Sequence, residues 1–136
     1  MAAPTIIERC EAHGLRLTAA RRVIARVIGD SSDHPDVETI HARASAFDAT
    51  ISVATVYRTV NLFEEAGILE RREFGDGRAR WEDADREHHD HLIDLQTGEV
   101  IEFCDPEIEA LQERIAARLG YDLKGHRLEL FGKKRR

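Results

Sequence analysis

The sequence predicts an α+β protein built from two small lobes, a mainly helical first lobe and a second lobe of short strands with one helix. Apolar residues recur every three or four positions in the first half, whereas the second half contains short segments of alternating polarity. The chain has 136 residues, a length that suits one domain or two small lobes. Hydrophobic residues make up 42% and charged residues 34%, which excludes a disordered chain, and no apolar run is long enough to span a membrane.

Two short helices are expected at the start of the chain. Thr5 and Glu8 have the spacing of a capping box, which indicates a helix that begins after Thr5 and ends at Gly14. Thr18 predicts the N-cap of a second helix with apolar residues on one face. Gly29 is expected to end this second helix, because glycine is common just past a helix C-terminus.

Two more helices follow. Asp36 is expected to cap the third, and Ser52 is expected to cap a fourth that stops at Gly67. The apolar face of the fourth helix is expected to consist of Val53, Val56, Val60, Leu62 and Phe63. Beyond it, alternating segments at 68–74 and 78–82 flank a Gly-Asp-Gly turn, which predicts a β-hairpin. Two helices joined by a short turn and followed by a hairpin are typical of a winged helix-turn-helix domain.

The second lobe is expected to be a small α/β domain that self-associates. Residues 1–83 are assigned to the winged-helix domain, 84–88 to a polar hinge and 89–136 to a dimerisation and metal-binding domain with a basic C-terminal tail. The expected elements of the second lobe are a hairpin of 91–95 and 99–103, a helix over 105–119 and a strand over 126–131. About fifty residues bury little core alone and leave strand edges open, which favours a homodimer.

Charge is unevenly distributed along the chain. The formal net charge of −6 argues against a nucleic-acid partner. Residues 1–26, however, hold five arginines against two glutamates, a local charge of +3. Acidic residues are concentrated instead in 82–122, around a group of histidines. This segregation predicts one region that faces an anionic partner and another that faces a cation.

The run His88-His89-Asp90-His91 is the strongest candidate for metal chemistry. In an extended chain His88 and Asp90 point to one side, and His89 and His91 point to the other, so the run can supply two different sites. Further imidazole and carboxylate ligands are available at His34, Glu82, Glu102, Glu109 and His126. Nitrogen and oxygen donors suit Fe, Mn, Zn, Co or Ni. The alternative is a solvated polar linker whose histidines bind nothing.

The start of the fourth helix is the candidate DNA contact. Small residues come first, and Thr55, Tyr57 and Arg58 lie off the apolar face. Tyr57 can touch a thymine methyl group, and Arg58 can reach a phosphate or a guanine. The alternative is an ordinary solvated amphipathic helix, against which the helix-turn-helix setting favours DNA.

Four sequence blocks, in order, resemble the ferric uptake regulator family. They are Gly14-Leu15-Arg16-Leu17-Thr18-Ala19-Ala20-Arg21, Ile51-Ser52-Val53-Ala54-Thr55-Val56-Tyr57-Arg58-Thr59-Val60, Ala66-Gly67-Ile68 and His88-His89-Asp90-His91-Leu92-Ile93. The resemblance extends from about residue 6 to residue 131. It implies a metal-dependent homodimeric repressor of iron homeostasis genes with a winged-helix DNA-binding domain and an α/β dimerisation domain, and it implies no enzymatic activity.

The resemblance also implies residue roles. By position, the regulatory site between the domains would use His34, Glu82, His89, His91 and Glu102, and a second site would use His88, Asp90, Glu109 and His126. Arg16 would enter the minor groove, and Thr55, Tyr57 and Arg58 would lie on the recognition helix. Fe(II) is the expected effector, with Mn(II) or Zn(II) as substitutes, and the expected partner is an A/T-rich palindromic operator in double-stranded DNA.

The chain departs from the family at one point. Many relatives carry a C-x-x-C pair that holds a structural zinc, but Asp94 and Thr97 occupy those positions here, so no Cys-ligated zinc is expected. Cys10 and Cys104 are too few for a disulfide framework, which favours a reducing, cytoplasmic location. The alternatives within the family are a manganese-responsive or a haem-responsive regulator, and those outside it are a metallohydrolase and a metal buffer.

Overall fold

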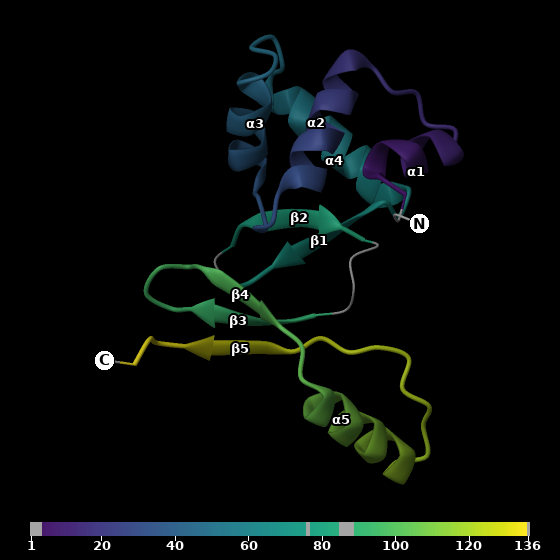
Figure 1. Cartoon of the computed structure of the whole chain (residues 1–136), viewed down its shortest axis with the longest axis vertical. Helices are drawn as coiled ribbons and strands as arrows, with labels where there is room; N and C mark the ends of the chain where they lie inside the picture. The colour runs from purple at the N-terminus through teal and green to yellow at the C-terminus, as the bar shows by residue number, and fades with distance from the viewer. Residues whose placement is uncertain (1–3, 76, 85–88, 136) are drawn as a thin grey trace. The chain divides into compact units, whose positions relative to one another are not determined.

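The computed structural model describes residues 4–75, 77–84 and 89–135, and the chain divides into two compact units, Met1–Arg86 and Glu87–Arg136 (Figure 1). The expected hinge therefore falls mostly on residues outside those described, as does His88. The elements of the first unit are the helices α1 (Ile6–Ala12), α2 (Ala19–Asp30), α3 (Val37–Ser45) and α4 (Val53–Glu65), and the strands β1 (Leu69–Glu73) and β2 (Ala79–Asp83). The order of four helices and a hairpin is that of a winged helix-turn-helix, as the sequence predicts.

The four predicted helix starts are confirmed. In each case the side-chain oxygen of the N-cap residue accepts a hydrogen bond from the backbone N–H three residues further along; these N-caps are Thr5, Thr18, Asp36 and Ser52. Such a bond satisfies one of the N–H groups that a helix leaves unpaired at its first turn. The starts of these four helices therefore follow from local chemistry that the sequence displays.

The predicted stop of α2 at Gly29 is wrong. The helix continues to Asp30, and the hydroxyl of its C-cap, Ser31, donates to the Val27 carbonyl at 2.6 Å. A Cβ built on Gly29 would lie 3.8 Å from Ile6 Cδ1, in ordinary van der Waals contact with the neighbouring helix α1. Gly29 therefore lies where two helices approach each other. From the sequence alone, a glycine in this position cannot be distinguished from one that ends a helix.

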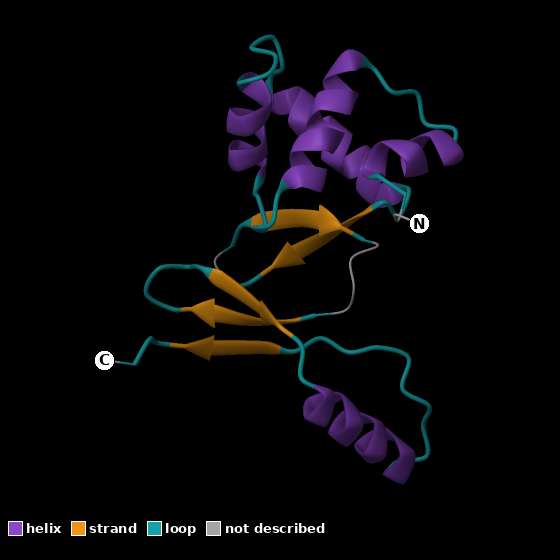
Figure 2. Ribbon diagram, viewed as in Figure 1, coloured by secondary structure: helices purple, strands orange, loops and turns teal. Residues whose placement is uncertain are grey.

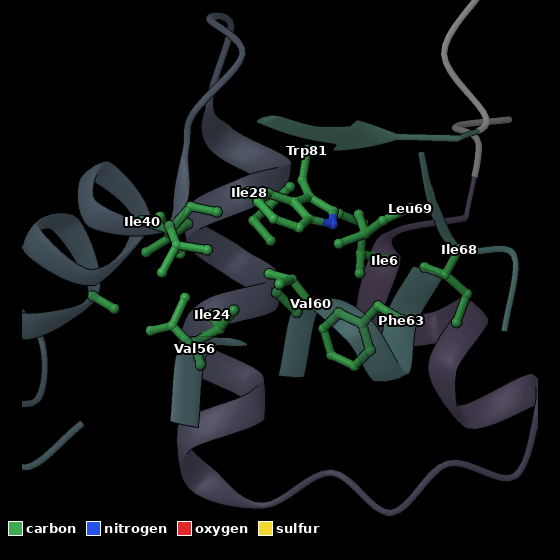
Figure 3. Packing of buried hydrophobic residues seen from close by; sticks show 14 of the residues in the cluster. Ile6, Ile24, Ile28, Ile40, Val56, Val60, Phe63, Ile68, Leu69 and Trp81 are labelled. Atoms are coloured by element: carbon green, nitrogen blue, oxygen red, sulfur yellow. The ribbon is translucent and has the colours of Figure 1, made fainter. Parts of the chain in front are cut away.

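The core of the first unit is formed by residues from all of its elements (Figure 3). Val56, Thr59, Val60 and Phe63 of α4 are buried and follow the three-and-four spacing of one helical stripe. Val53 continues this spacing but is the first residue of the helix and is 40% exposed, so its assignment to the buried core face is wrong. The other labelled core residues are Ile6, Ile24, Ile28, Ile40, Ile68, Leu69 and Trp81.

The second unit consists of a three-stranded sheet and one helix (Figure 2). Its elements are β3 (Asp90–Asp94), β4 (Val100–Phe103), α5 (Pro106–Arg118) and β5 (Glu129–Gly132). The strand order is β4-β3-β5, with β4 antiparallel and β5 parallel to β3. β5 is shorter than the predicted strand, so His126 precedes it in a loop.

The residues that the structure describes leave the apolar side of α5 exposed. Leu111, Ile115 and Leu119 recur at helical spacing but are 47%, 40% and 70% exposed, whereas Ala116 is buried. The helix itself is predicted correctly, including Pro106 at its first turn. Among the described residues, no helix combines the length and hydrophobicity needed to cross a bilayer.

Candidate metal centres and nucleic-acid interface

A buried imidazole–carboxylate pair lies in the first unit. His34 belongs to the loop between α2 and α3, and its Nε2 atom is 3.0 Å from Oε2 of Glu82 on β2. The loop is fixed against β2 by the Trp81 N–H, which donates to the Pro35 carbonyl at 3.1 Å, and by a bridge between Asp36 and Arg80. Backbone pairing of the loop with the hairpin therefore brings together two residues that are 48 positions apart in the sequence.

Glu82 is held in its charged form. Burial alone would raise the pKa of its carboxyl group, but hydrogen bonds from His34 and Arg72 lower the pKa to about 2. Arg72 Nε donates to Glu82 Oε1 at 2.6 Å, so the two carboxylate oxygens face different partners. The edge of the His34 ring also contacts the Phe74 ring, with centroids 5.4 Å apart. The pair thus offers an imidazole nitrogen and an ionised carboxylate in an ordered setting.

A second group of potential ligands lies on the hairpin of the second unit. His91 on β3 pairs with Glu102 on β4, and His89 Nε2 is 3.6 Å from Glu102 Oε1. The rings of His89 and His91 lie edge to face with centroids 4.7 Å apart. These three side chains gather at one place, which agrees with the alternation expected of an extended segment.

A third group lies within the second unit, on other elements. Asp90 of β3, Glu109 of α5 and His126 before β5 each offer one ligand atom, and these atoms all lie within 4.8 Å of one another. His126 Nε2 is 3.0 Å from Asp90 Oδ1 and 3.6 Å from Glu109 Oε1. One imidazole and two carboxylates are donors that Zn(II), Fe(II) and Mn(II) accept, so the residues present fit a divalent ion. His88, the fourth expected member, lies outside the described residues.

The exposed side of α4 presents the candidate DNA contacts. Tyr57 is 51% exposed and Arg58 is exposed, whereas Thr55 is half-buried and accepts a hydrogen bond from Arg58 Nη2 at 3.2 Å. Arg16 is exposed in the loop between α1 and α2. Since the opposite side of α4 packs into the core, these polar side chains are available to a partner.

Asp94 and Thr97, which stand where many members of the family that the sequence resembles carry a cysteine pair, lie at the end of β3 and in the turn that follows it. The Asp94 carboxylate accepts hydrogen bonds from the backbone N–H groups of Gln96 and Thr97 at 2.8 and 3.2 Å, and it thereby fixes the turn between β3 and β4. Cys10 is buried in the first unit and Cys104 is exposed after β4.

Sequence reasoning missed two residues. The first is Arg72, which contacts the Glu82 carboxylate; its role depends on the hairpin register that places Glu70 opposite Glu82, because such a like-charge pair favours a nearby cation. The second is His41 of α3, which is half-buried and whose Nε2 atom lies 3.0 Å from the Ile51 carbonyl oxygen.

Residues 12–131 match the model of the ferric uptake regulator family. The chain is 61% identical over 130 residues to a ferric uptake regulation protein of Rhizobium leguminosarum bv. viciae, which covers 96% of this chain and 92% of that protein. Among solved structures, a zinc-bound manganese uptake regulator superposes with a TM-score of 0.85 at 58% identity, covering 97% of this chain and all of the other. The ferric uptake regulator of Vibrio cholerae superposes with a TM-score of 0.82 at 38% identity, covering 92% and 96%.

Proposed function

Since the chain belongs to the ferric uptake regulator family and is a metal-responsive transcriptional regulator, we propose that it is a repressor that Fe(II) activates for DNA binding. The observation that carries this proposal is the buried His34–Glu82 pair in the unit that contains the recognition helix. The pair supplies two ligands, whereas a divalent ion of this kind prefers four to six. The remaining ligands are proposed to be His89, His91 and Glu102 of the second unit.

The proposed switch acts through the orientation of the two units. The domain assignment is retained: 1–83 bind DNA, 84–88 form a hinge and 89–136 dimerise and bind metal. A bound divalent ion supplies positive charge that the carboxylates of Glu82 and Glu102 share. With His34 and Glu82 of the first domain and His89 and His91 of the second bound to the same ion, the angle between the two domains would be fixed. Metal binding and DNA binding to that arrangement stabilise each other reciprocally.

The second metal site is proposed to be structural. Asp90, Glu109 and His126 support this role because they join β3, α5 and the segment before β5 within one unit. His88 is retained as a fourth ligand on the sequence argument alone. An ion at this site would tie the helix to the sheet, in a chain without the family's thiolate pair.

The DNA partner is proposed to be an A/T-rich palindromic operator bound by a homodimer. Arg16 would enter the minor groove, and Thr55, Tyr57 and Arg58 would read the major groove. The exposed apolar side of α5 supports self-association, because such surfaces are rarely left open to water. The role is regulatory, with no catalytic residues, and its proposed place is the cytoplasm, where the operator is.

Manganese is the second candidate effector. It is favoured by the 58% identity to a solved manganese uptake regulator, whereas the relative at 61% identity is named for iron. Imidazole and carboxylate ligands accept both ions, so the ligand set does not separate them. A haem-responsive regulator is the remaining alternative.

Operator binding with and without metal tests the proposal. Affinity for an A/T-rich palindrome is measured at one fixed salt concentration, with no metal, with Mn(II), and with Fe(II) under anaerobic conditions. We expect either ion to raise the affinity strongly. Equal affinity in all three conditions would contradict the proposed switch while leaving DNA binding intact, and haem would then be tested.

A further inference from the structure

Arg72 contacts two carboxylates of the hairpin formed by β1 and β2. Its Nε atom donates to Glu82 Oε1 at 2.6 Å, and its Nη2 atom donates to Glu70 Oε2 at 2.9 Å. The register places Glu70 directly opposite Glu82 in neighbouring strands, where two like charges destabilise the pair. One guanidinium thus bridges both carboxylates, and its planar fork fixes the direction of each bond.

The bond from Arg72 determines which oxygen of Glu82 is presented to His34. Oε1 is engaged by Arg72, while Oε2 lies 3.0 Å from His34 Nε2. A carboxylate held in this way offers an ion one oxygen, on the side of the imidazole. A carboxylate without this bond can rotate and offer both oxygens.

We propose that Arg72 is a positioning residue of the regulatory metal site, which makes Glu82 a one-oxygen ligand directed toward His34. This inference rests on the proposed function, since it assumes that His34 and Glu82 bind the effector. Partners of this kind fix the orientation of metal ligands, and their removal commonly lowers metal affinity by about 10–100-fold.

The neighbouring arginine provides a matched control. Arg71 lies on the same strand and its side chain is 48% exposed, compared with 18% for Arg72. Arg71 Nη2 donates to Glu73 Oε1 at 2.7 Å, whereas Arg72 donates to the carboxylates of Glu82 and Glu70. Replacement of either arginine by glutamine removes the same charge from the same strand, but only the change at Arg72 removes the bond to Oε1 of Glu82.

The test is Mn(II) binding to the full-length protein, followed by electron paramagnetic resonance. Glu82→Gln identifies the part of the bound signal that belongs to this site. We expect Arg72→Gln to lower the Mn(II) affinity of that part by about 10–100-fold. We also expect an altered spectrum of the bound ion, because the carboxylate can then adopt another coordination mode. Arg71→Gln should retain the wild-type affinity and spectrum.

Arg72→Lys keeps the charge but replaces the fork by a single ammonium group, so it should recover only part of the affinity. It also carries the test if the glutamine variant does not fold, because its bound Mn(II) spectrum must then differ from that of the wild type. Wild-type affinity and spectrum in the Arg72 variants, or an equal loss in Arg71→Gln, would overturn the positioning role. A wild-type protein that binds no Mn(II) at this site would instead contradict the proposed function itself.

Discussion

The two units differ in how large a hydrophobic core each forms from the residues of one chain. In the first unit, buried side chains from four helices and the hairpin form a continuous core. In the described part of the second unit, residues 89–135, the buried hydrophobic side chains are Ile93 and Ala116. The first unit therefore resembles a complete small domain, whereas the second depends on something else to cover or tie together its elements.

The candidate ligands follow the same division. The first unit, which also contains the proposed recognition helix α4, holds a partial set, His34 and Glu82. The second unit holds a more complete group, in which Asp90, Glu109 and His126 lie close enough to bind one ion without help from another unit. A partial set of ligands suits a switch, because it binds an ion well only when the chain's arrangement supplies the remaining ligands. A complete set within one unit suits a structural role.

The largest expected effect is at the switch. His89→Ala removes a proposed ligand and should lower metal-dependent operator affinity by more than about 100-fold, since even indirect partners of ligands contribute about 10–100-fold. The measurement is operator binding at limiting Mn(II). His13→Ala is the control, because His13 is exposed at the end of α1 and has no proposed role. Normal metal-dependent binding by His89→Ala would remove it from the site.

The next effect concerns the uncovered helix. Ile115→Asp places a charge on the apolar side of α5 and should weaken the dimer by about 2 kcal/mol or more, as expected for the centre of an interface. Light scattering over a concentration series measures this change. Ala117→Asp adds the same charge on the other side of the helix and should leave the dimer intact. A dimer that tolerates Ile115→Asp would show that another surface covers the second unit.

A smaller effect is expected at the proposed structural site. A ligand that binds only the folded state stabilises it, by about 1.4 kcal/mol at ten times its dissociation constant. Asp90→Asn should remove most of the rise in thermal midpoint that Zn(II) produces, while operator binding at saturating Mn(II) is largely retained. Asp122→Asn, an exposed position before β5, is the control. A full metal-induced rise in Asp90→Asn would assign the stabilisation to other ligands.

What the sequence predicts well is local. The four N-caps each depend on a side chain and an N–H three residues away, and the separation of His89 from Asp90 depends on the two-residue period of a strand. That these residues bind metal stays a prediction.

What the sequence does not predict depends on distant pairing. The His34–Glu82 contact follows from the Trp81–Pro35 backbone bond, and without the family resemblance nothing local would join the two residues. Arg72 requires the register of β1 and β2, which a single sequence does not define. Likewise, helical spacing shows that α5 has an apolar side but not which surface covers it.

The smallest expected effect contrasts two glycines, one from each unit. Gly29 lies inside α2 without a left-handed backbone, and a Cβ there meets Ile6 Cδ1 at an ordinary 3.8 Å. Gly29→Ala should therefore stabilise the first unit by about 0.5–1 kcal/mol, because alanine loses less backbone entropy in a helix. Gly120 directly follows Leu119, the C-cap of α5, and has φ +87°, so Gly120→Ala should destabilise the second unit by about 1 kcal/mol or more. Chemical unfolding of each variant measures both changes, and a loss of stability in Gly29→Ala would mean that the contact between α1 and α2 cannot accept even one methyl group.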